Sequence, residues 1–309
     1  MEARINQHLD RIEALIQARM PGSLYQFELF DLATNQAYAR GPQPEAIMPW
    51  GSVYKLFVIA AVVQMIDEGL LLPEQLLLLE KDRFTHGVGV LQQFSHLTHL
   101  SVVDCCKMVV ATSDNVCADT LHELVGNARV ARLFAAAGCT HSRLTDNLDT
   151  LIGRLLAAPH QWAADDYMYS PEMFVNYEAA IADLLPGNCT TAHDCNRLWQ
   201  HLHTTAFSPT GRELFFNIVH TYCMTGRVSY YANYGATPKL RGKTGSMGVS
   251  VVMTETTLLY DPTERQPLSF FTFLSQHNRL RYFELCDVLA CAGLELAKVY
   301  APNTVLKNS

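Results

Sequence analysis

The spacing of apolar residues changes several times along the chain, and each change marks a predicted element. Over residues 1–20 the apolar positions recur every three to four residues, which predicts an amphipathic helix. Its apolar stripe consists of Ile5, Leu9, Ile12, Leu15 and Ile16. Residues 23–31 and 36–40 instead carry β-favouring residues on either side of a turn at residues 31–35, so a hairpin follows the helix.

The centre of the chain is predicted to be helical. A loop with three prolines leads into a long apolar helix that starts at Ser52 and ends at Gly69. From residue 70 to residue 204 the pattern predicts further helices and no strand. These helices cover residues 101–111, 116–125, 128–137, 171–185 and 191–203.

Strands return near the C-terminus, at residues 237–244, 249–259 and 268–275, before a closing helix over 281–299. This order predicts an α+β fold, in which a five-stranded antiparallel sheet is flanked by the terminal helices and an all-helical lobe is inserted. We expect residues 1–50 and 205–309 to form the α/β lobe and residues 51–204 the helical lobe, with the active site at the seam between them.

Composition narrows the classes of partner. The 309 residues are 49% hydrophobic and 17% charged, as in a globular protein with a large core. A net charge of −7 and the lack of a basic run argue against nucleic acid and favour a small-molecule or peptide-like substrate. The longest apolar run, residues 56–63, is less than half of the roughly 20 residues that span a bilayer, so no membrane insertion is predicted.

Nine cysteines, an odd number, lie mostly in apolar windows and predict buried free thiols. This favours a cytoplasmic location, or a periplasmic or secreted one if a leader was removed. The closest cysteine and histidine grouping, Cys189, His193 and Cys195, lacks the spacing of a zinc site. We therefore predict no metal and no cofactor, and the oligomeric state stays open.

Candidate chemistry begins with Ser52 and Lys55, which lie one helical turn apart and so on one helix face. Burial and nearby cations lower the pKa of a lysine, and a neutral Lys55 can take the proton of Ser52. The S-x-x-K pattern is short, and a helix-start serine followed by a lysine that reaches solvent gives the same four residues.

Two further motifs strengthen this interpretation. Ser113-Asp114-Asn115 follows a predicted helix, and Lys243-Thr244-Gly245, followed by Ser246, ends a predicted strand. Each motif alone is a common helix cap or strand end. With all three in this order and context, the chain resembles the class A serine β-lactamase and penicillin-binding-protein family over nearly its whole length. Residues 87–91, 104–124 and 188–192 also resemble segments of that family.

The resemblance implies an acyl-enzyme mechanism. Ser52 would be the nucleophile, Lys55 its base or a relay to it, and the backbone N–H groups of Ser52 and Ser246 the oxyanion hole. Ser113 would carry a proton to the leaving nitrogen. The substrate would be bound by Asn115, Lys243, Thr244, Gly245 and Ser246, with Lys243 also lowering the pKa of Lys55.

The sequence departs from the family where the deacylating glutamate is expected. Arg143 and Leu144 match the arginine-leucine pair that precedes it, but the alignment then places Leu148 at the glutamate position. The alternatives are Asp146, Asp149, Glu172 and Glu178, each of which is otherwise an ordinary surface carboxylate. Residues 147–167 are expected to form an insertion or an additional helix near the cleft.

Three functions follow from this pattern. The first is a class A β-lactamase-type serine hydrolase acting on β-lactams or a related cyclic or activated amide. The second is an intracellular esterase or peptidase of the same fold. The third is a penicillin-binding protein that is acylated on Ser52 and releases the product slowly.

Overall fold

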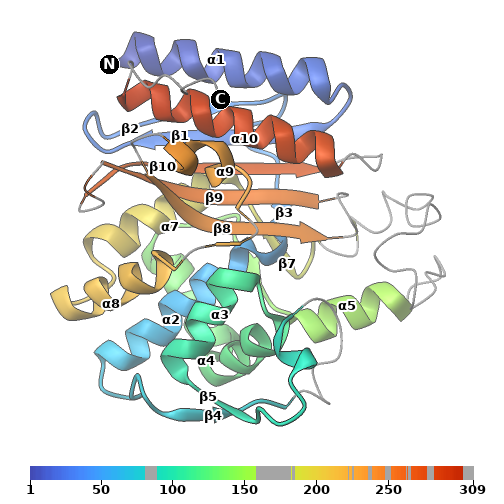
Figure 1. Ribbon diagram of the computed structural model, residues 1–309, viewed down its shortest axis with the longest axis vertical. Coiled ribbons are helices and arrows are strands. Elements are labelled where there is room, and N and C mark those ends of the chain that lie inside the picture. Colours follow the sequence, from blue (N-terminus) through green and yellow to red (C-terminus); the bar gives the residue numbers. More distant parts are fainter. Residues whose placement is uncertain are drawn as a thin grey trace.

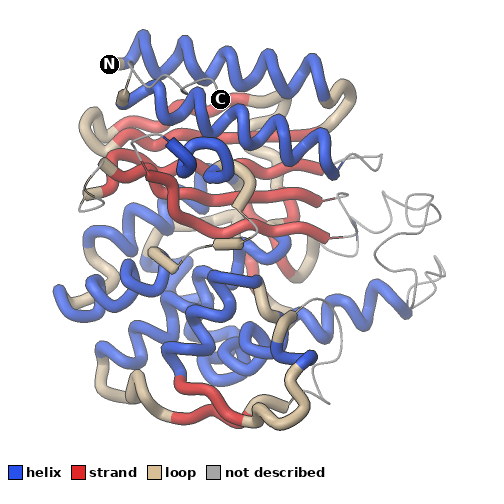
Figure 2. Tube along the Cα trace, viewed as in Figure 1, coloured by secondary structure: helices blue, strands red, loops and turns tan. Residues whose placement is uncertain are grey.

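The computed structural model describes most of the chain in one α+β architecture (Figure 1). The described residues are 1–80, 89–157, 182, 185–221, 223–224, 226–235, 239–247, 252–261, 263, 266–276 and 282–301. Within them, one layer of strands lies between two layers of helices (Figure 2).

The described strands include a five-stranded antiparallel sheet in the order β2-β1-β10-β9-β8, which confirms the predicted fold class. These strands are β1 (Leu24–Asp31), β2 (Gln36–Arg40), β8 (Lys239–Met247), β9 (Val252–Tyr260) and β10 (Pro267–Gln276). The hairpin from the N-terminus joins the three C-terminal strands through β1 and β10, in a register that sets Leu29 opposite Phe271.

The two faces of the sheet belong to two apolar cores, because side chains alternate along each strand. Leu29 and Phe271 pack with α1 (Glu2–Arg19) and α10 (Tyr282–Tyr300), whereas the next residues, Phe30 and Phe270, join the core of the inserted helices. Figure 1 shows α1 and α10 side by side on one face, as expected for the terminal helices. The short helix α9 (Ser229–Gly235), which the pattern did not predict, packs on α10 and β8.

The other helices in the described ranges lie on the opposite side of the sheet. They are α2 (Lys55–Asp67), α3 (Val102–Thr112), α4 (Asn115–Ala136), α5 (Leu148–Ala157), α7 (Ala192–Thr204) and α8 (Pro209–Val219). Helix α7 lies directly on β1 and β10, whereas α8 contacts α2 and α3. Helix α2 is buried from Lys55 to Val63, so it is the central helix of this layer. The division of the chain at residues 50 and 204 stays a prediction.

The prediction that residues 70–204 hold no strand is wrong. Within the described residues, β4 (Leu76–Leu78) pairs with β5 (His99–Ser101), and β7 (Asn188–Thr190) pairs with both β3 (Met48–Pro49) and β6 (Arg143–Leu144). Strands of two or three residues are too short to show an alternating pattern, which explains why they were missed.

Other expected elements need smaller corrections. The helices predicted over 116–125 and 128–137 form one element, α4, which is interrupted at Gly126 with φ 69° and ψ 154°. The helix that follows Ser52 begins with a 3-10 turn, η1 (Gly51–Tyr54), and a second turn, η2, covers Leu91–Gln93. The helix expected over 171–185 lies almost wholly outside the described residues.

None of the helices in the described ranges is both long and apolar enough to cross a bilayer.

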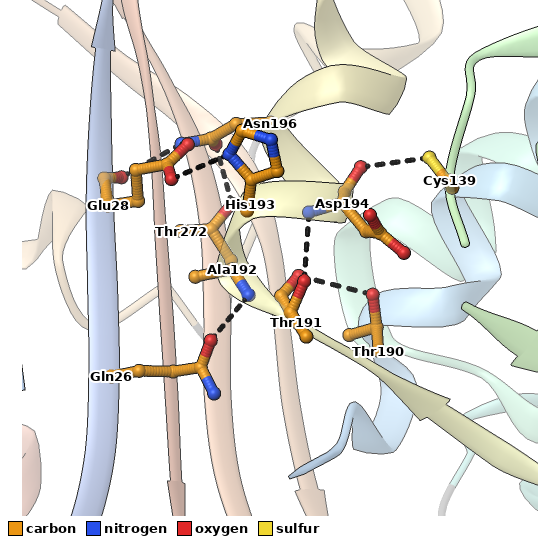
Figure 3. Close-up of polar contacts among 10 residues, drawn as sticks. All are labelled: Gln26, Glu28, Cys139, Thr190, Thr191, Ala192, His193, Asp194, Asn196 and Thr272. Atoms are coloured by element: carbon orange, nitrogen blue, oxygen red, sulfur yellow. Dashed lines mark hydrogen bonds and ion pairs between the residues drawn. The ribbon is translucent and has the colours of Figure 1, made fainter. Parts of the chain in front are cut away.

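Side chains of β1 hold the start of α7 (Figure 3). The buried Glu28 carboxylate accepts from Asn196 Nδ2 at 3.1 Å and lies 3.0 Å from His193 Nδ1. On the same strand, Gln26 Oε1 accepts from the N–H of Ala192 at 2.8 Å. Thr191 caps the helix, because its hydroxyl accepts from Asp194 N at 3.1 Å. These contacts seat α7 on the sheet at its N-terminal end.

The pair of His193 with Glu28 predicts a pH-dependent contribution to stability. The hydrogen bond with Glu28 raises the pKa of His193 in the folded protein above its unfolded value. The contribution is therefore complete below the unfolded pKa and disappears as the pH rises through the folded pKa. Because the imidazole is half exposed, we expect His193→Gln to cost about 0.5 kcal/mol at a pH of about 6, measured by urea unfolding, and less at a pH of about 8.5.

The exposed His96 supplies the control, since His96→Gln should leave the unfolding free energy unchanged at both pH values. An equal loss for His193→Gln at both pH values would show that the pair acts by packing and not by charge.

Candidate active site

Ser52 lies in the 3-10 turn η1, directly before α2. The residue before this turn, Trp50, is fully buried, and its ring centroid lies 5.4 Å from that of Phe57 and 5.4 Å from that of Phe134. Gly51 takes a positive φ of 50°, which a glycine adopts without strain. The Trp50 carbonyl also accepts from Thr254 Oγ1 at 2.6 Å, which ties the turn to β9. The position of Ser52 is thus set by packing on one side and by the sheet on the other.

The K-T-G strand β8 runs against this turn. A Cβ atom added to Gly245 would lie 2.7 Å from Ser52 N and 2.5 Å from Trp50 O, and one added to Gly51 would lie 3.0 Å from Ser246 N. The two backbones therefore approach more closely than any side chain would allow. This approach brings Ser52 beside the segment Gly245–Ser246, as the proposed oxyanion hole requires.

Lys55 is buried with 1% exposure, and its ammonium group points into the S-D-N segment. Its Nζ donates to Ser113 O at 2.6 Å, to Asn115 Oδ1 at 2.6 Å and to Ser113 Oγ at 3.3 Å. These contacts place two of the three motifs in direct hydrogen-bond contact.

The third motif reaches the same hydroxyl. Lys243 is fully buried, and its Nζ donates to Ser113 Oγ at 2.9 Å and to Thr244 O at 2.7 Å. Ser113 ends α3 with φ 60° and ψ 28°, a left-handed conformation that is rare for a residue other than glycine. Backbone strain of this kind persists only where surrounding contacts impose it. Here the two lysines hold the strained residue from both sides.

Burial is the main reason that both lysines hold their protons weakly. Burial, followed by the charge of Lys243, holds the pKa of Lys55 well below its usual value. Burial lowers the pKa of Lys243 to about 8. A buried lysine with a depressed pKa can exist as the neutral amine, which is the form that accepts a proton.

Asp114, the middle residue of the S-D-N motif, stabilises the backbone around the site through hydrogen bonds. Its Oδ1 accepts from Cys117 N at 3.0 Å, which caps α4, and its Oδ2 accepts from Leu91 N at 2.9 Å. A Cβ atom on Gly89 would lie 2.6 Å from that Oδ2. Asp114 therefore fastens the segment that follows Gly89 to the site, while Gly87 and Val88 lie outside the described residues.

A comparison with known protein families identifies the family of this chain. The sequence model of the β-lactamase enzyme family matches residues 9–283. The chain belongs to the β-lactamase enzyme family. No curated protein matches it.

Several solved structures share the fold at low sequence identity. A mutant of the class A β-lactamase of the last common ancestor of Gram-negative bacteria is 18% identical with a TM-score of 0.73, and the match covers 96% of this chain and 100% of that one. PBP-A is 14% identical with a TM-score of 0.71, over 96% of each chain. L2 complexed with relebactam is 21% identical with a TM-score of 0.71, over 93% of this chain and 94% of that one.

Around this β-lactamase-type site, the structure adds charged residues that the motifs did not identify. Glu255 on β9 is buried, and its carboxylate accepts from the N–H groups of Arg227 and Val228, each at 3.1 Å. Arg227 Nη1 in turn lies 3.4 Å from Gly245 O and 3.3 Å from Thr254 O. A glutamate between the threonines at the centre of β9 was the only signal of this arrangement in the sequence.

The candidate deacylating carboxylates lie in different surroundings. Leu148, the first residue of α5, is buried, and the neighbouring Asp149 has a buried Oδ1 atom with no hydrogen-bond partner among the described residues. Asp146 instead lines an open cavity of about 260 Å³ together with His122 and Asn127. Glu172 and Glu178 lie outside the described residues.

The described part of the chain contains no group of three or more histidine, cysteine, aspartate or glutamate residues that would hold a metal ion.

The close approach of β8 to η1 gives a prediction. Gly245→Ala places a methyl group against Ser52 N and Trp50 O, so the strand and the turn must separate. We expect acylation to slow by about 100-fold, the usual cost of one lost oxyanion-hole donor, measured as the rate of covalent labelling by a β-lactam.

Gly69→Ala is the matched control. Gly69 also has a positive φ, of 72°, but lies at the far end of α2, where a Cβ atom meets nothing within 4 Å. Both variants should lose stability, and only Gly245→Ala should lose labelling rate. Equal labelling rates in the two variants would contradict the assignment of this contact to the site.

Proposed function

We propose that this protein is a serine hydrolase that forms an acyl-enzyme on Ser52 with β-lactams or a related cyclic or activated amide. The observation that carries the proposal is the convergence of Lys55 Nζ and Lys243 Nζ on Ser113 Oγ, at 3.3 Å and 2.9 Å, next to the turn that holds Ser52. An arrangement that buries two lysines around one hydroxyl has a high electrostatic cost, which is expected where proton transfer requires it.

Acylation then proceeds through groups already in place. Lys55 as the neutral amine accepts the Ser52 proton, directly or through a relay, while Ser52 Oγ bonds to the carbonyl carbon of the substrate. The N–H groups of Ser52 and Ser246 stabilise the oxyanion. When the C–N bond breaks, Ser113 donates its hydroxyl proton to the leaving nitrogen, and Lys55 or Lys243 restores that proton.

Substrate binding uses the same elements. Asn115 is proposed to bond a side-chain amide of the substrate, and Lys243, Thr244 and the Gly245–Ser246 backbone to bind its carboxylate end. The partner is a small acyl compound, either a β-lactam or a peptide-like one. No cofactor, metal, nucleic acid or membrane takes part in this scheme.

A second candidate, a penicillin-binding protein that deacylates poorly, is favoured by Leu148. This buried leucine occupies the place at which the resemblance expects the deacylating glutamate. One of the structural neighbours is a leucine-to-glutamate mutant of PBP-A, solved as an acyl-enzyme complex with penicillin G; it is 14% identical with a TM-score of 0.71, over 96% of this chain and 97% of that one. In this second candidate the acyl group is released slowly, with Asp149 as the remaining base.

The nucleophile and the substrate class can be tested together. We expect turnover of a chromogenic cephalosporin, or a persistent adduct of penicillin detected by intact-mass spectrometry, and loss of both in Ser52→Ala. Slow turnover with a long-lived adduct would favour the penicillin-binding alternative over the hydrolase.

A short-chain p-nitrophenyl ester serves as the comparison substrate. Brisk ester turnover without reaction with any β-lactam would favour the esterase alternative. Activity that survives in Ser52→Ala would show that the nucleophile is assigned wrongly.

The base for deacylation gives a separate prediction. If the buried Asp149 Oδ1 activates the hydrolytic water, Asp149→Asn should lengthen the lifetime of the adduct by about 100-fold without changing the rate of its formation. Asp146→Asn is the matched control, because Asp146 lines the open cavity beside His122. Unchanged adduct lifetimes in both variants would remove both aspartates from the mechanism.

A further inference from the structure

A third buried carboxylate, Asp119, lies close to the site and has no role in the scheme above. It follows Asn115 by one turn of α4, so both residues face the same side of that helix. Its exposed fraction is 1%. A carboxylate is rarely buried to this extent without partners that hold its charge.

The partners of Asp119 are two backbone groups at the start of α5. The N–H of Leu148 donates to Asp119 Oδ1 and the N–H of Asp149 donates to Asp119 Oδ2, both at 2.8 Å. The first N–H groups of a helix have no partner within the helix, and a negative charge there is favourable. Asp119 thus caps α5 from a neighbouring helix.

The geometry needs a carboxylate and not an amide. A carboxylate offers two acceptor oxygens, whereas an asparagine side chain offers one oxygen and an NH2 group that only donates. With asparagine at position 119, one of the two N–H groups would face another donor. The Asp119 carboxylate is therefore needed to accept hydrogen bonds from both the Leu148 and the Asp149 N–H groups.

The same charge acts on Lys55. Burial and the charge of Lys243 lower the pKa of Lys55, while the charges of Asp119 and Asp114 raise it. Burial raises the pKa of Asp119 itself to about 6, and the charge of Asp149 also acts to raise this pKa. The two backbone N–H groups and the charge of Lys55 act in the opposite direction. Burial, and after it the charge of Asp119, also raises the pKa of the Tyr54 phenol on η1.

We propose that Asp119 is a positioning residue that couples the two halves of the reaction, holding the first turn of α5 through Leu148 and Asp149 while its charge opposes the loss of the Lys55 proton. The inference rests on the proposed acyl-enzyme function for the Lys55 half, and on hydrogen bonds alone for the α5 half. Asp119 contacts no substrate in this scheme. Its charge raises the pH at which Lys55 becomes a base, against the larger effects of burial and Lys243, and its hydrogen bonds orient the segment that carries the proposed deacylating residue.

The sign of the effect on acylation follows from the charges. Asp119→Asn removes a negative charge that stabilises the ammonium form of Lys55, so the pKa of Lys55 falls and the neutral amine is present at lower pH. We expect the acid limb of the pH profile of the acylation rate to move to lower pH. The adduct lifetime should change as well, because Asp149 is no longer held in place.

Asp194→Asn is the matched control. Asp194 is also a buried carboxylate that accepts from a backbone N–H, that of His141 at 2.7 Å, but it lies on α7 against other partners. A loss of stability alone would affect both variants, whereas only Asp119→Asn should move the acid limb. An unmoved acid limb in Asp119→Asn would overturn the Lys55 half of the inference.

The α5 half is tested without any substrate. Amide hydrogen exchange at Leu148 and Asp149 in the resting protein should be about tenfold faster in Asp119→Asn than in the wild type, and unchanged in Asp194→Asn. The wild type gives the same test with no variant, since protection of these amides should fall as the pH is lowered through about 6 and Asp119 becomes protonated. Protection that does not depend on Asp119 or on its protonation would overturn this half.

The experiments distinguish a failure of the proposed acyl-enzyme function from a failure of the inference about Asp119. Faster exchange in Asp119→Asn, in a protein that no β-lactam or ester acylates, would support the anchor and refute the proposed function. Acylation at Ser52 with an unmoved acid limb and unchanged exchange would support the proposed function and refute the inference.

Discussion

Two buried lysine side chains that share one serine hydroxyl are the constraint on which the rest of this site depends. Lys55 and Lys243 come from different parts of the fold, α2 and β8, and both reach Ser113 Oγ. Burying an amine in a medium of low polarity makes its charged form costly, so the two side chains stay on one hydroxyl only if both elements are rigid. The apolar packing around α2 and the pairing of the edge strand β8 with β9 along its whole length provide that rigidity.

Much of this arrangement could be predicted from the sequence, because its parts produce strong local patterns. The apolar stripe of α1 and the alternating residues of β1 are read directly from periodicity, and they define the layers. The three motifs are recognisable because acyl transfer needs particular residue types in a fixed order. The short strand β7 and the helix α9 left no pattern, since tertiary contacts and not local preference hold them in place.

The charged residues that support the site could not be predicted for a different reason. Asp119, Arg227 and Glu255 are isolated charged residues that are buried in the fold. The sequence around each of them does not show which distant backbone groups the side chain will contact. Asp119 meets α5 across a separation of about thirty residues along the chain. Such contacts depend on the three-dimensional approach of elements, so only the folded structure identifies them.

The complete burial of α2 has a consequence for how this protein can change. From Lys55 to Val63 every side chain of the helix is buried, so a change in the size of one side chain is not accommodated by turning it toward solvent. A substitution that alters volume anywhere along these residues must displace the helix or its neighbours, and the turn that carries Ser52 moves with it. Reactivity is therefore sensitive to the sizes of residues that never approach a substrate. Divergence within this architecture is easier at the rims of the site, in the segments that follow Gly89 and precede α5, than along the helix that carries the lysine.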